Sequence, residues 1–210
     1  MKKRTSGSRG GDPQSGATVA ESNPPTQSNR QFLRTATAGQ HTELDELLGQ
    51  IDLGDPMGYR QFLAAHAWWG GVESWLTSSG MTTLLPQWTG FCRAGALTAD
   101  LTSLGMVAAT TTEWPRRPLP VEGRQRDSAL WGAAYVLAGA SLGARFLQRR
   151  TAGKTGRPDA FLCSADATQW PDFVSALDSH RLDRQVAAVW ARDVFELALS
   201  VAAPPRVAAE

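Results

Sequence analysis

A glycine-rich, uncharged stretch constrains the fold of this chain more than any other feature. The run WGAAYVLAGASLGARFL, from Trp131 to Leu147, has a helical pattern, yet it contains Gly132, Gly139 and Gly143 and is rich in alanine. Each interior glycine destabilises a helix by about 1 kcal/mol relative to alanine. Glycine is favoured where something must lie close to the backbone, such as another helix or a flat ligand.

The rest of the chain also follows a helical pattern. Residues 31–48 carry apolar and small side chains at intervals of three and four, which predicts one amphipathic helix with a stripe of Leu33, Thr37, His41, Leu44 and Leu48. Asp55 is the expected N-cap of the next helix, with Pro56 at its first position, and Gly70-Gly71 is expected to break it.

Further helices are predicted near residues 97–104, 128–150, 170–178 and 182–201, and the first of these is expected to stop at Gly105. The sequence shows no strand pair and no repeat. It therefore predicts an all-α fold, a single-domain helical bundle over residues 29–205. Residues 1–28 are rich in Ser, Gly, Pro and Gln and are predicted to be a disordered tail.

Charge and targeting signals narrow the function classes. The net charge of +1 gives no global field that would favour nucleic acid. The basic start of the chain is not followed by an apolar segment, so we expect no export signal and a cytoplasmic protein. The longest uncharged run, residues 128–144, is too short and too weakly apolar for a membrane span. Cys92 and Cys163 match no CxxC pattern and are interpreted as two buried free thiols.

His41 is the strongest candidate ligand among the three histidines. It lies on the predicted apolar stripe and is therefore expected to face the interior, and Asp45 follows one turn later on the same face. A carboxylate that holds one imidazole nitrogen leaves the other free to bind a metal. Arg34 lies about 10 Å back along the helix axis. His66 is interpreted as a core residue and His180 as a helix-end residue.

The predicted helix with the three glycines offers a surface that could lie against a flat ligand. Gly139 and Gly143 are four residues apart and share one face. Close helix packing is one use for them, and contact with a flat ligand is the other. A flat ligand between a histidine-bearing helix and a glycine-bearing helix would be a haem sandwich.

Two segments resemble the haem oxygenases, in particular the bacterial biliverdin-producing branch associated with bacteriophytochromes. LRTATAGQHTELDELL at residues 33–48 is similar to the proximal helix of that family, and YVLAGASLGARFL at residues 135–147 is similar to its distal helix. Weaker similarities are YRQFLAAHAWW at 59–69, LTADLTSLG at 97–105 and WPDFVSALD at 170–178. The resemblance extends over about residues 30–200.

The resemblance implies the haem oxygenase fold and reaction. Haem would be both substrate and cofactor, and with dioxygen it would be opened to biliverdin with release of carbon monoxide and ferrous iron. Electrons would come from an external reductase or ferredoxin, and a bacteriophytochrome would be a candidate acceptor of the biliverdin. The basic stretch of Arg149, Arg150, Lys154 and Arg157 would be either a solvated turn or a patch for an acidic donor.

The resemblance also implies a role for each site residue. His41 would be the axial ligand of the iron, Asp45 its partner, and Arg34 a partner of a haem propionate. Tyr135 would contact the haem. Gly139 and Gly143 would let the distal helix lie over the iron, with Ser141 and the backbone holding water there.

Three departures from the family pattern keep other functions open. The positions of a usual Glu, Ser and Gly are Ala138, Ala140 and Ala144, and the last of these is expected to add a methyl group on or beside the haem face. An inactive or slow haem-binding protein, a carrier or sensor, is therefore the alternative. A cofactor-free interaction protein and a di-iron protein are two further hypotheses.

Overall fold

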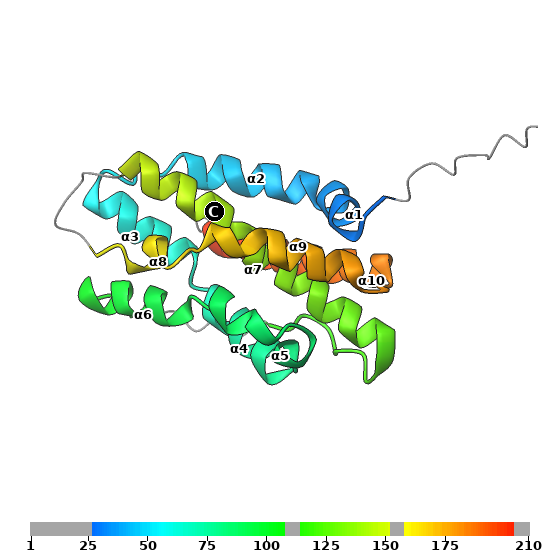
Figure 1. The fold of residues 1–210 in the computed structure, drawn as a ribbon. Helices are drawn as coiled ribbons and strands as arrows, with labels where there is room; N and C mark the ends of the chain where they lie inside the picture. The colour runs from blue at the N-terminus through cyan, green and yellow to red at the C-terminus, as the bar shows by residue number, and fades with distance from the viewer. Residues whose placement is uncertain (1–26, 108–113, 152–157, 204–210) are drawn as a thin grey trace, which may run out of the picture.

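The computed structural model describes residues 27–107, 114–151 and 158–203, and every regular element in these ranges is helical (Figure 1). The all-α prediction is therefore confirmed. The α-helices are α1 (Asn29–Ala36), α2 (Ala38–Gly49), α3 (Pro56–Ala65), α4 (Trp69–Ser78), α5 (Met81–Leu84), α6 (Ala94–Ser103), α7 (Gly123–Thr151), α8 (Ala160–Cys163), α9 (Trp170–Ser179) and α10 (Arg184–Ala202). Two 3-10 helices, η1 (Pro86–Phe91) and η2 (Ala167–Gln169), lie between them.

The long helix α7 and the C-terminal helix α10 form the centre of the bundle. They pack along each other more extensively than any other pair of helices. The two backbones lie close together at Gly132, where an added Cβ atom would lie 2.0 Å from the carbonyl oxygen of Ala187. Gly132 therefore serves helix packing, because no larger residue fits between the two backbones at this separation.

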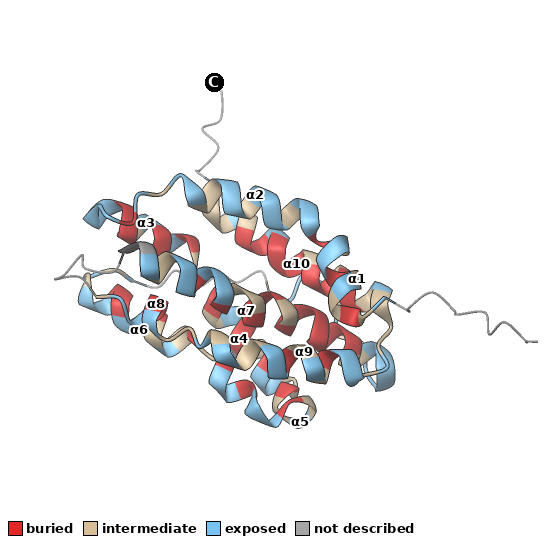
Figure 2. Ribbon diagram, turned by 45° about the horizontal axis from the view of Figure 1, so that its top comes forward, coloured by how far each residue is buried: buried red, intermediate tan, exposed pale blue. Residues whose placement is uncertain are grey.

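The helix α10 lies against α2 as well as against α7 (Figure 2). It packs against both, whereas within the described residues α2 and α7 do not pack closely on each other. Burial follows this arrangement: nine of the 19 residues of α10 are buried, and α2 contains no fully buried residue.

The first helix is anchored at its N-terminus. Ser28 and Gln31 form a capping box, so Ser28 is part of the folded domain and not of the predicted disordered tail. The remainder of that tail, residues 1–26, lies outside the described residues. The Asn29 side chain donates to the carbonyl oxygens of Leu177 and His180 and accepts from Arg184.

The predicted single helix over residues 31–48 is in fact two helices that meet at Thr37. Thr37 is buried, and its hydroxyl donates to the carbonyl oxygen of Leu33 at 2.8 Å. The carbonyl oxygen of Ala36 accepts a hydrogen bond from Arg192 of α10 at 2.8 Å. The bend is thus stabilised by a long-range side chain, which the periodicity of the segment does not reveal.

The next predicted helix begins as expected but ends earlier. The Asp55 side chain accepts from the backbone N–H of Gly58 at 2.9 Å, and Pro56 occupies the first helical position, so both predictions are confirmed. The break falls at residues 66–68 and not at Gly70-Gly71, which lie inside the first turn of α4. The chain turns there because Trp68 and Trp69 enter the core.

Two buried carboxylates link α4 to α6 and α6 to α8. Glu73 accepts from the indole of Trp69 and from two backbone N–H groups at the start of α6. Asp100 accepts from the hydroxyl of Tyr59 and from the N–H groups of Ala160 and Phe161, which fixes α8 against α6. Each carboxylate replaces its lost hydration with several hydrogen bonds.

The remaining predicted elements are confirmed with shifted ends. α6, α9 and α10 match their predicted ranges within three residues, and α7 begins five residues earlier than predicted, at Gly123. Gly105 follows α6 with a φ of +63°. Cys163 is exposed and Cys92 is partly buried, so the prediction of two buried thiols was wrong.

By length and composition alone, α7 is the one described helix that qualifies as a membrane span, over residues Gly123–Arg149. The run that we considered too short is thus part of a longer helix. Of its apolar window, 56% is buried inside the bundle, as in the central helix of a packed domain.

The glycines of α7 generate a paired prediction for stability. Replacing Gly132 with alanine should lower the free energy of unfolding by about 1–3 kcal/mol, because the new methyl group overlaps the backbone of α10. Gly143→Ala should raise it by about 1 kcal/mol through helix propensity, because no atom lies within 4 Å of its added Cβ. Urea denaturation of both variants measures these changes. Equal effects of the two substitutions would contradict the assignment of Gly132 as the packing glycine.

Candidate functional site

His41 and Asp45 form a pair on the outer surface of α2. The Nδ1 atom of His41 lies 3.0 Å from a carboxylate oxygen of Asp45, and the two side chains are 61% and 68% exposed. The prediction that His41 faces the interior was therefore wrong. An ionised carboxylate only accepts hydrogen bonds, so the pair places the imidazole proton on Nδ1 and leaves the Nε2 lone pair free.

The ring of His41 lies near α10. Its centroid is 5.8 Å from that of Phe195, whose side chain is almost fully buried. The imidazole thus lies between a carboxylate and an aromatic ring, and most of its side chain is exposed. This is an arrangement that can bind a metal centre supplied by a ligand.

A second exposed surface lies on α7, which we call the glycine face: Gly139, Leu142, Gly143 and Phe146. These residues share one side of the helix, and Leu142 and Phe146 are 43% and 61% exposed. An added Cβ at Gly143 would meet no atom within 4 Å, and one at Gly139 would make only an ordinary 3.7 Å contact with Trp170. Helix packing in this structure therefore requires neither glycine.

The other small residues of the motif lie away from the glycine face. Ser141 is buried, and two residues along a helix correspond to about 200° of rotation, so it points to the opposite side from Gly139 and Gly143. The structure does not bring it to the predicted position. Ala138 and Ala144 are also buried in the core, so the expected methyl group on the face is absent, while Ala140 is partly exposed.

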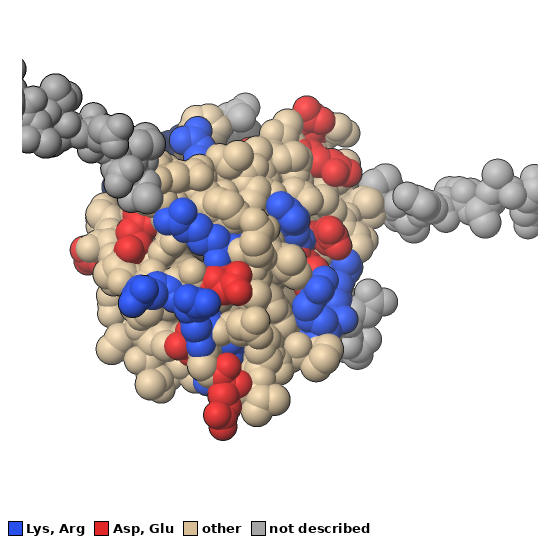
Figure 3. All heavy atoms as spheres, turned by 90° about the vertical axis from the view of Figure 1, so that its right-hand side faces the viewer, with Lys and Arg blue, Asp and Glu red and all other residues tan. Residues whose placement is uncertain are grey.

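Positive charge lies at the Tyr135 end of the glycine face. Burial raises the pKa of Tyr135, and the charges of Arg30 and Arg34 on α1 oppose that rise. Figure 3 shows the face of the molecule on the right-hand side of Figure 1, where Lys and Arg side chains alternate with Asp and Glu. Arg34 and Tyr135, two predicted ligand contacts from distant parts of the chain, are thus close enough to interact electrostatically.

The other two histidines are engaged elsewhere. The Nδ1 atom of His66 lies 2.7 Å from the carbonyl oxygen of Phe62, and its ring packs among aromatic side chains, namely Phe62, Trp69 and Phe161. His180 ends α9 as predicted, with its Nδ1 atom 2.7 Å from the carbonyl oxygen of Ala176. In the described parts of the chain, no three His, Cys, Asp or Glu side chains converge to hold a metal ion. That finding gives the di-iron hypothesis no support.

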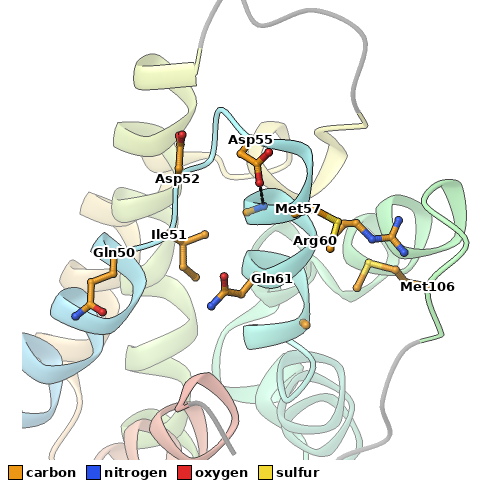
Figure 4. A pocket seen from close by; sticks show the side chains of 10 residues that line it. Gln50, Ile51, Asp52, Asp55, Met57, Arg60, Gln61 and Met106 are labelled. Atoms are coloured by element: carbon orange, nitrogen blue, oxygen red, sulfur yellow. Dashed lines mark hydrogen bonds between the residues drawn. The ribbon is translucent and has the colours of Figure 1, made fainter.

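A cavity of about 490 Å³ lies apart from these residues, at the C-terminal end of α2 (Figure 4). It opens between the α2–α3 connection and α3, and its lining includes Ile51, Asp55, Met57, Arg60 and Met106. Arg60 is held by the carbonyl oxygen of Leu104, and Asp55 by its cap. None of the predicted site residues lines it.

Comparison with known proteins gives no family for this chain: no family model matches it, and no curated protein is similar to it. The case for a function therefore depends on the residues themselves.

Two neighbours of the candidate site were not predicted. Phe195 lies beneath His41, and Trp170 lies beside Gly139. Trp170 is in one of the segments with weaker family similarity, which was the only signal in the sequence. Phe195 has none, because its position depends on how α10 crosses α2.

His66 generates a prediction for the pH dependence of stability. Burial lowers its pKa from 6.5 to about 4, although the hydrogen bond to Phe62 opposes this shift. Between pH 6.5 and pH 4 the unfolded chain binds a proton that the folded protein does not, so stability falls as the pH falls. This group should contribute a loss of about 3 kcal/mol across that range.

The measurement compares unfolding free energies of the wild type and His66→Phe at pH 6.5 and pH 4. The variant should lose less stability than the wild type over this range. Identical losses in both proteins would show that His66 takes up its proton as readily folded as unfolded.

Proposed function

We propose that this protein is a haem oxygenase of the bacterial biliverdin-producing branch. Haem would bind between α2 and the glycine face of α7 and be cleaved to biliverdin, carbon monoxide and ferrous iron. Dioxygen is the oxidant, and an external reductase or ferredoxin supplies the electrons. The all-α bundle is compatible with the haem oxygenase fold that the two helix motifs imply.

One observation carries this proposal. Helix packing leaves room for a larger residue at positions 139 and 143, yet both are glycine. Interior glycines destabilise a helix. At Gly132 in the same helix, packing requires glycine, because an added Cβ would overlap the backbone of α10. Gly143 faces open space, and Gly139 would gain only an ordinary contact with Trp170. Two such glycines next to two exposed apolar side chains would be explained by a ligand that lies on the backbone. A cofactor-free packing protein would gain stability from alanine at both positions.

The geometry of α2 supplies the other half of the site. Asp45 fixes the orientation of the His41 ring and makes Nε2 the ligand atom, while the exposure of the ring leaves room for a large partner. A bound macrocycle would cover a helix that has no fully buried residue. Ligand binding would thus add the apolar burial that α2 lacks.

The positive end of the site suits the carboxylates of haem. Arg34 and Arg30 lie near Tyr135, and their charges would attract two propionates. Further along the glycine face, Leu142 and Phe146 are exposed, and the exposed Arg149 follows one turn later on the same side of the helix. The arginines of α1 would face the edge of haem that carries its carboxylates.

The glycine face provides no side-chain acid or base. Ser141, Ala138 and Ala144 lie in the core, so proton delivery on this side would depend on water and backbone groups. Haem supplies the redox chemistry when bound. His41 would hold the iron through its imidazole, and the protein would orient the macrocycle and bring backbone close to it.

The apolar character of the glycine face also supports a second candidate, a haem carrier or sensor that does not cleave its ligand. Titration with hemin followed by ascorbate or a ferredoxin–reductase system under air separates the two. A saturable Soret band that decays to the red absorption of biliverdin supports the enzyme. A stable band supports the carrier, and no band refutes both.

His41→Ala tests the axial ligand. Because the side chain is exposed, the variant should keep its circular dichroism spectrum and melting temperature, while the wild-type Soret maximum is lost. His66→Phe is the matched control and should keep the wild-type haem spectrum. An unchanged spectrum in His41→Ala would place the ligand elsewhere.

Arg34→Ala tests the carboxylate contact. The affinity for hemin should fall about three- to tenfold at low salt, the range expected for a partly exposed charge pair. The affinity for hemin dimethyl ester, which lacks both negative charges, should not change. The control is Arg124→Ala, which removes a different exposed arginine, located on α7. It should leave both affinities unaltered. Equal losses for hemin and its ester would refute the contact.

A further inference from the structure

The indole of Trp170 borders the glycine face at Gly139. Its Cη2 and Cζ3 atoms lie 3.7 Å from the position of an added Cβ at Gly139. These atoms belong to the six-membered ring, so the outer edge of the indole leans over this glycine. Trp170 is only partly buried, which leaves that edge accessible.

The indole is held firmly from behind. Trp170 begins α9, is followed by Pro171 within the first turn, and stacks on Phe173 with a centroid distance of 5.6 Å and an interplanar angle of 13°. Phe173 itself is fully buried and contacts Trp131 and Phe91. A side chain fixed in this way can act as a rigid wall.

The glycine face is therefore closed at one end and open at the other. At Gly139 the indole blocks movement of a ligand toward α9, whereas around Gly143 no atom lies within 4 Å of an added Cβ. A flat ligand on this face can extend past Gly143 but not past Trp170.

The same closed end carries the charges that suit carboxylates. The ring centroids of Tyr135 and Trp170 are 6.0 Å apart, and Arg30 and Arg34 act on the Tyr135 hydroxyl. A ligand with two carboxylates on one edge would thus be held by charge and stopped by the indole at neighbouring points. Two fixed points determine the rotation of a planar molecule within its own plane.

We propose that Trp170 is a positioning residue, which sets the in-plane orientation of the bound macrocycle and so determines which meso carbon is opened. This inference rests on the proposed function. It adds a determinant of product regiochemistry that lies on α9, outside both helix motifs.

The test compares Trp170→Ala, Trp170→Phe and the wild type. The wild type should give one predominant biliverdin isomer on chromatography, Trp170→Ala should give a mixture and bind hemin about three- to tenfold more weakly, and Trp170→Phe should restore the single isomer. Trp75→Ala removes another partly buried indole, which stacks on Trp190 away from the glycine face, and should not change the isomer ratio. Melting temperatures show whether each variant is folded.

A second measurement does not need turnover. The paramagnetically shifted methyl resonances of bound hemin report its in-plane orientation, and they should indicate one orientation in the wild type and at least two in Trp170→Ala. An unchanged isomer ratio and unchanged methyl resonances in Trp170→Ala would refute the inference while leaving the proposed function intact. Failure of the wild type to bind hemin would instead refute the proposed function, and this inference with it.

Discussion

The contact between α7 and α10 at Gly132 is the constraint on which the rest of the structure depends. A backbone-to-backbone approach of this kind brings two long helices together along most of their length, and the largest part of the apolar core forms between and around them. Because α10 is held so close to one side of α7, the opposite sides of both helices are left for other elements. The helices α4, α8 and α9 cover parts of α7, and α1 and α2 lie on α10.

The placement of α2 follows from this central pair and is fixed at its N-terminal end, where it joins α1, and by packing along α10. Hydrogen bonds from Asn29, Arg184 and Arg192 fix α1 and the bend at Thr37, and α2 extends from that bend over α10. Its three leucines, Leu44, Leu47 and Leu48, are only partly buried. A helix that is held at its N-terminal end and along one side can expose His41 and Asp45 without giving up the fold. The surface it leaves uncovered is the part of the bundle best suited to gain stability from a ligand.

The proposed chemistry follows from what the glycine face lacks. An apolar stripe with two missing side chains cannot act as an acid, a base or a nucleophile, so any reaction there depends on groups that the ligand brings. The protein would then determine only orientation, through His41 on one side, the arginines of α1 at one edge and the indole of Trp170 beside Gly139. Cleavage and storage of haem would use the same binding residues. The two functions would differ in whether water and dioxygen reach the glycine face.

The sequence by itself determined the helical class, the Asp55 cap, the end of α6 at Gly105 and the pairing of His41 with Asp45, because all of these depend on residues within one or two turns of each other. It could not determine that the helix over residues 31–48 bends at Thr37, since the stabilising arginine is more than 150 residues away. It also could not tell the three glycines of α7 apart. Only the tertiary structure decided that Gly132 packs against α10, that Gly139 borders Trp170 while Gly143 is uncovered, and that Ser141 points into the core. Periodicity gives the relative directions of side chains around a helix, but which direction is buried depends on where the neighbouring helices lie.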